Sequence, residues 1–86
     1  MEVINKDVEM IAIFDGEGNI RPFRFKYQEQ NETVVVNVNR LIHRKIEKIG
    51  KQTNIIFKCE SVICGKKKIY EIIFDKDKLS WKLYKA

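Results

Sequence analysis

The chain has 86 residues, of which 44% are hydrophobic and 34% are charged, and its formal net charge is +5. This length supports one domain, 1–86, around one core, and this composition excludes a disordered chain. No apolar run approaches the roughly 20 residues of a membrane-spanning helix, and the acidic start MEVINKDVEM is not typical of a signal peptide. We therefore expect a cytoplasmic protein with reduced cysteines and no membrane partner.

The first predicted element is a β-hairpin over residues 8–27. Two apolar segments, VEMIAIF and IRPFRFKY, flank the turn signal DGEGN. Because Pro22 has no amide hydrogen, either the second strand lies at a sheet edge or Pro22 itself lies at a bulge.

The segment IRPFRFKY alternates aromatic and cationic residues, as a single-stranded nucleic-acid platform does. In a strand, Phe23, Phe25 and Tyr27 share one face, while Arg24 and Lys26 share the other. Exposing the rings to bases would bury two unpaired charges at several kcal/mol each, which is more than base stacking returns. We therefore predict that the rings are buried and the cations are exposed.

The middle of the chain fits two different elements. The segment TVVVNV is predicted as a β-strand. From Val38 to Ile49 the apolar residues recur at helical spacing, Asn39 can cap a helix, and Gly50 can end one. We predict a helix over about 40–49, against the alternative of a strand that continues from Val38.

The remaining residues predict three strands, 54–63, 69–74 and 79–84, joined by turns rich in charged residues. Trp81 and Leu83 share one face of the last strand. About six strands with tight turns predict a mainly β fold, a small, curved antiparallel sheet or barrel, which becomes α+β if the helix forms.

No residue set in the sequence predicts catalysis, a cofactor or a metal site. His43 is the only histidine, and no nucleophile is identifiably placed beside it. Cys59 and Cys64 supply two ligands where a structural zinc site needs four. We expect Cys59 to lie in the core, and we expect the chain to be neither an enzyme nor a cofactor-binding protein.

Positive charge is concentrated in the second half of the chain. Residues 1–39 hold four Lys/Arg and seven Asp/Glu, whereas residues 40–86 hold 13 and five. Clustered cations raise the affinity for polyanions, although lysines also keep exposed strand edges soluble. The candidate polyanion-binding residues are Arg40, Arg44, Lys48, Lys51, Lys66, Lys67 and Lys68.

Two long segments are similar to a family of short bacterial proteins, mainly clostridial, that has no assigned activity. These segments are IFDGEGNIRPFRFKY and FKCESVICGKKKIYEIIFDKDKLSWKLYK. This resemblance implies no catalytic motif. More faintly, Tyr70 and Glu71 with Trp81-Lys82-Leu83 are similar to the C-terminal domains of polymerase-like mutagenesis proteins, without their paired tryptophans. The first resemblance covers the turn and core positions Phe14, Asp15, Gly18, Arg21, Pro22, Phe25, Val36, Gly50, Phe57, Cys59, Tyr70, Glu71, Trp81 and Leu83.

Together these patterns predict a non-catalytic protein-interaction module. Its partner is another protein, or a second copy bound through an edge strand or through the face of Leu41, Ile42 and Ile46. The alternative is a nucleic-acid-binding module that uses a basic face within residues 40–86.

Overall fold

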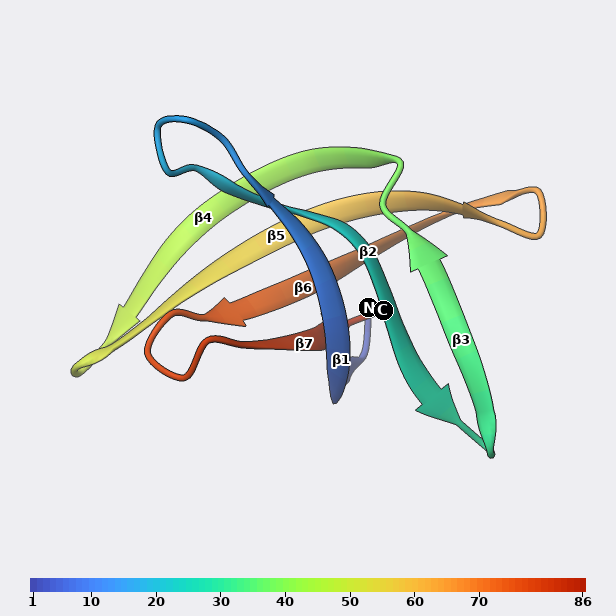
Figure 1. Cartoon of the computed structure of the whole chain (residues 1–86). Coiled ribbons are helices and arrows are strands. Elements are labelled where there is room, and N and C mark those ends of the chain that lie inside the picture. Colours follow the sequence, from blue (N-terminus) through green and yellow to red (C-terminus); the bar gives the residue numbers. More distant parts are fainter.

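The computed structural model describes residues 1–86 and consists of β-strands joined by short turns (Figure 1). No helix that could cross a lipid bilayer is present. All strand pairs are antiparallel, which confirms the mainly β prediction, with seven strands in place of about six. The strands are β1 (Val3–Phe14), β2 (Ile20–Glu29), β3 (Glu32–Asn37), β4 (Arg40–Ile49), β5 (Gln52–Ile63), β6 (Lys66–Asp75) and β7 (Ser80–Lys85).

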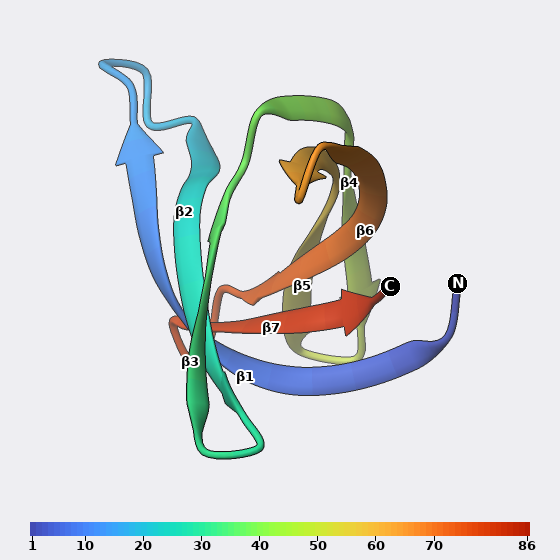
Figure 2. The same ribbon diagram turned by 90° about the vertical axis from the view of Figure 1, so that its right-hand side faces the viewer.

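The strands form one sheet in the order β3-β2-β1-β7-β6-β5-β4, so β3 and β4 are its two edges. The sheet folds over, and two layers face each other (Figure 2). β1 belongs to both layers, because its first half pairs with β7 and its second half with β2. The register of β1 shifts between Val3 and Lys6, where Asn5 has a positive φ of 51°. The curved sheet is therefore confirmed, but it does not close into a barrel.

The hydrophobic core lies between the two layers. Phe25 from β2 packs with Phe57 and Ile72 from β5 and β6, and the last two are 0% exposed. The Trp81 ring lies 5.8 Å from the Phe57 ring, centroid to centroid. Trp81 and Leu83 both pack in this core, so their predicted common face is confirmed.

A chain of buried hydroxyl groups joins β3 to the opposite layer. Ser61 of β5 donates a hydrogen bond to the backbone carbonyl of Asn37, at the end of β3. The hydroxyl groups of Ser61 and Tyr70 lie 2.5 Å apart, and Tyr70 donates because the Ser61 hydrogen is already used. The connection to β4 is fixed nearby, where the Asn39 side chain accepts the amide hydrogen of Val62 at 2.7 Å.

The predicted helix over 40–49 is wrong, because these residues form the strand β4. The pairing of β4 with β5 shifts between Leu41 and His43, so Ile42 is an extra residue in the strand. A bulge changes which residues face each side, and the apolar positions before and after it then imitate helical spacing. A helix would also leave the edge of β5 unpaired, whereas the strand satisfies its backbone groups.

A second bulge lies in β2. Its pairing with β1 shifts between Ile11 and Ala12, which leaves Phe23 as the extra residue. Phe25 is 2% exposed, as predicted, but Phe23 is 42% exposed, so the predicted burial of Phe23 is wrong. Pro22 thus lies at a bulge of an inner strand rather than at a sheet edge. Arg24 and Lys26 are exposed, as predicted.

Two-residue turns fix the register of the hairpins. Gln30 and Asn31 have φ values of 48° and 65°, and Cys64 and Gly65 have 51° and 75°. Two successive positive φ angles are typical of the turns that match the twist of antiparallel strands. Gly50 has a φ of 60° in the β4–β5 turn, a conformation that costs glycine little because it has no Cβ.

Candidate interaction surface along β4

The seven candidate basic residues are spread along the length of the β4–β5–β6 layer. Arg44 and Lys48 lie on β4, and Lys51 lies in the turn that follows it. The lysines 66–68 begin β6 at the other end, and Arg40 begins β4 on their side. β5 joins the two ends with 12 residues, a length of about 40 Å at roughly 3.3 Å per residue. The seven residues therefore do not form one patch.

Arg40 is engaged in an ion pair across the sheet. Its Nε and Nη2 atoms lie 3.2 and 3.3 Å from the two carboxylate oxygens of Glu60. These hydrogen bonds raise the pKa of Arg40 and lower the pKa of Glu60. Arg44 and Lys48 have no carboxylate within 4.0 Å, so they are the cations of β4 that remain free for an external anion.

β4 is paired on one side only. The two-residue turn after β4 makes Ile49 the first residue of β4 that is hydrogen-bonded to β5. Going back along β4 from Ile49, the backbone N–H and C=O groups of successive residues point alternately away from β5 and toward it. The backbone groups of Arg44, Ile46 and Lys48 therefore point to the open side. A further strand can form hydrogen bonds there without displacing a contact of the fold. We call residues 43–48 the β4 edge.

The side chains of the β4 edge place positive charge on both faces of the sheet. Arg44, Ile46 and Lys48 lie on the face of the core residues of β5, and His43 and Lys45 lie on the outer face. Ile46 is 59% exposed, because the opposite layer does not extend over it. The edge thus combines free backbone groups, an exposed aliphatic side chain and unpaired cations.

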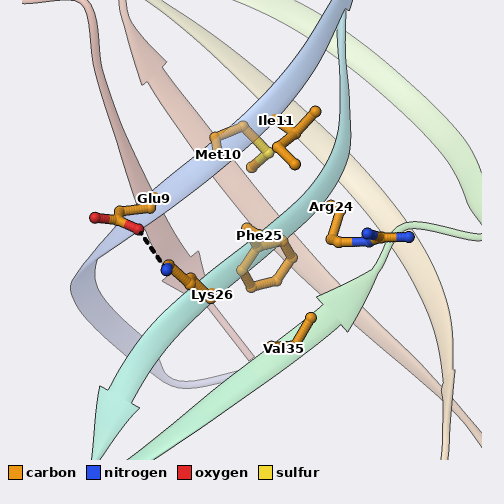
Figure 3. A pocket seen from close by; sticks show the side chains of 7 residues that line it. All are labelled: Glu9, Met10, Ile11, Arg24, Phe25, Lys26 and Val35. Atoms are coloured by element: carbon orange, nitrogen blue, oxygen red, sulfur yellow. Dashed lines mark ion pairs between the residues drawn. The ribbon is translucent and has the colours of Figure 1, made fainter.

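A hollow of about 450 Å³ lies on the outer face of the β1–β2–β3 layer (Figure 3). An ion pair between Lys26 and Glu9, 3.2 Å long, forms one side. Arg24, on the same face, donates a hydrogen bond to an asparagine side chain of β3. Ile11 and Val35 are 56% and 57% exposed there. Since its cations are already bound by neighbours, this hollow offers an apolar surface and no free anion site.

The histidine and the cysteines lie apart from one another. His43 is exposed on β4, opposite Lys58 of β5. Cys59 lies in the core, as predicted, and burial raises the pKa of its thiol to about 12. Cys64 is exposed in the β5–β6 turn. No group of three or more His, Cys, Asp and Glu side chains is placed to hold a metal ion.

The two thiols are expected to differ sharply in reactivity. Iodoacetamide at neutral pH should label Cys64 and leave Cys59 unmodified, because the reactive species is an accessible thiolate. Intact-protein mass spectrometry should show one adduct on the folded protein and two adducts in urea. The Cys64→Ser variant should show none until it is unfolded. Equal labelling rates for the two thiols in the folded protein would contradict the burial of Cys59.

The sequence pattern did not reveal the β4 edge. Only Ile46 is apolar between His43 and Lys48, so this segment shows no two-residue period that predicts a strand. Comparisons with models of protein families, with curated proteins and with solved structures give no match, so the function is inferred from the geometry of this chain.

Proposed function

We propose that the protein is a non-catalytic interaction module that binds an extended, acidic segment of a partner polypeptide as an added strand along the β4 edge. The observation that carries this proposal is a ten-residue strand with one neighbour, whose open side is flanked by the unpaired cations Arg44 and Lys48. In strand addition, main-chain hydrogen bonds supply affinity and alternate side chains supply specificity. Acidic side chains on the added strand match these cations.

A second copy of the chain is a poor occupant of the β4 edge. An antiparallel pair of β4 strands centred on Ile46 would place Arg44 of one copy opposite Lys48 of the other. Like charges directly opposite each other destabilise a strand pair. The charge of the edge thus discourages self-pairing and favours an acidic partner.

A peptide of alternating glutamate and valine tests the proposal by fluorescence anisotropy. Ile46→Pro removes an outward N–H and leaves the ladder to β5 intact, whereas the matched control Ile46→Thr keeps that N–H. The parent and Ile46→Thr should bind the peptide, more weakly at high salt, and Ile46→Pro should lose about tenfold or more in affinity.

Two results would contradict strand addition at β4. Equal binding by the parent and Ile46→Pro would show that the backbone of the edge takes no part. Tighter binding of a single-stranded oligonucleotide, unaffected by Ile46→Pro, would assign Arg44 and Lys48 to nucleic acid instead. Circular dichroism of both variants should match the parent.

Self-association is a second candidate function, and the uncharged edge at β3 favours it. The hairpin register points the backbone groups of Thr33 and Val35 away from β2. An antiparallel pair centred on Val34 would place Thr33 opposite Val35, with no like charges between them. Val35 is also 57% exposed, so pairing extends an apolar outer face.

Sedimentation velocity at micromolar concentrations tests this second function. The parent should show a dimer, and Val35→Lys should be monomeric, because a lysine on each copy of a paired edge places two positive charges close together. Thr33→Ser keeps the edge neutral and serves as the control. A parent that stays monomeric at every concentration would contradict self-association through β3.

A further inference from the structure

We infer that the open corner between the two layers, beside the β5–β6 turn, is a binding site for a small amphipathic carboxylate. The corner contains a pocket of about 300 Å³, and eight of its nine lining residues are hydrophobic. Ligand pockets span roughly 300–1,000 Å³ and combine an apolar lining with a few polar groups. β3 and the β5–β6 turn, which flank this corner, lie on the same side of the molecule (Figure 1).

Aromatic rings form one wall of the pocket. Phe25 stacks on Tyr27 with ring centroids 6.2 Å apart, and it meets Tyr70 edge-on at 5.6 Å. Ile63 and Ile69 also line the pocket and are 39% and 46% exposed. A short hydrocarbon chain placed between these groups would remove both aliphatic side chains from water, which is the favourable step for an apolar ligand.

Two lysines supply the charge that selects a carboxylate. Lys68 is the only charged side chain among the lining residues. Lys6 pairs with Leu83 across β1 and β7, and its Nζ lies 5.1 Å from the centroid of the Tyr27 ring. Neither lysine has a carboxylate within 4.0 Å, whereas three other lysines of the chain do. The hydrocarbon chain of the ligand therefore fills the pocket, its carboxylate pairs with the Lys68 ammonium group, and Lys6 adds positive charge beside the Tyr27 ring.

The pocket shares no residue with the β4 edge, so it is independent of the proposed peptide site. A neutral alcohol would gain the apolar contacts but leave the ammonium groups unmatched. An alkylammonium ion would bring a third positive charge to them. Comparing ligands with the same chain and different head groups therefore separates the role of the lysines from that of the pocket.

Titration of the protein with octanoate, octan-1-ol and octylammonium, followed by methyl NMR, tests this inference. Octanoate should shift the methyl signals of Ile63, Ile69 and Leu83 and bind most tightly of the three. Lys68→Gln should weaken octanoate binding about two- to fivefold, the effect of one partly exposed ion pair, and leave octanol binding unchanged. Lys68→Arg should bind octanoate as tightly as the parent does. Lys66→Gln, which lies outside the pocket, should have no effect on octanoate binding.

Three outcomes would overturn the inference. The first is equal affinity for octanoate and octylammonium, which would remove the role of charge. The second is unchanged octanoate binding by Lys68→Gln. The third is the absence of shifts at Ile63 and Ile69 when octanoate is present at millimolar concentration.

Discussion

Replacing Phe25 with alanine is expected to lower the free energy of unfolding by about 3–5 kcal/mol. Phe25 is 2% exposed and lies between the two layers, where its ring contacts those of Tyr27 and Tyr70. Its strand is hydrogen-bonded on both sides, so the backbone cannot move in to fill the cavity. Since natural domains are stabilised by only roughly 0.05–0.15 kcal/mol per residue, this loss removes much of the stability of the chain. Urea unfolding monitored by Trp81 fluorescence measures it.

Phe23→Ala is the matched control, two residues away on the same strand. The bulge turns Phe23 outward, where it is 42% exposed and the Arg24 guanidinium lies 5.7 Å from its ring centroid. Its loss should cost about 1 kcal/mol or less, the scale of an exposed cation–aromatic contact. Equal losses for the two variants would contradict the bulge and would place both rings in the core, as simple alternation predicts.

The sequence predicted the core residues that are not themselves the extra residue of a bulge. Cys59, Trp81 and Leu83 are examples, because side chains alternate strictly between the two faces of a regular strand. Phe23 and Ile42 are the exceptions, since each is the extra residue of a bulge. A bulge is defined by the pairing with a neighbouring strand, so the residues of one strand alone do not show where it lies.

The candidate site was less predictable than the core. Composition identified the basic residues, but the register of β4, β5 and β6 places Lys48 and Lys68 at different ends of the layer. The free edge at β4 follows from the order of the whole sheet, in which consecutive strands β3 and β4 do not pair. The apolar corner lies between the two layers that β1 joins, and no local pattern indicates that β1 changes its partner from β7 to β2 between Val8 and Glu9.

The two sheet edges also differ in a way that bears on function. Residues 33–37 of β3 are uncharged, whereas residues 43–48 of β4 include three Lys/Arg, one histidine and one glutamate. Charged edges resist pairing with a second copy, and neutral edges permit it. The difference in charge therefore supports the two separate proposals, a second copy at β3 and an acidic segment at β4.

The free energy of unfolding is expected to fall as the pH rises from about 9 to 12. Burial raises the pKa of Cys59 from 9.0 to about 12 and the pKa of Tyr70 from 10.0 to about 12. Both groups ionise at a lower pH in the unfolded chain than in the folded one. Their contribution to the free energy of unfolding is therefore complete below the ordinary pKa values and is lost as the pH rises through the folded pKa values. At about 1.4 kcal/mol per pKa unit, Cys59 alone accounts for a loss on the order of 4 kcal/mol.

Urea unfolding at a series of pH values between about 8 and 11.5, repeated on three variants, separates the two groups. Cys59→Ala should be less stable than the parent near pH 8 but lose less stability as the pH rises, because its titrating thiol is gone. Tyr70→Phe should differ from the parent in slope only above about pH 10, since tyrosine titrates later than cysteine. Cys64→Ser should keep the parent slope, because Cys64 is exposed. A parent-like slope in Cys59→Ala would mean that the Cys59 thiolate forms as easily in the folded protein as in the unfolded one. That result would place the thiol in contact with water, against its 0% exposure between the layers.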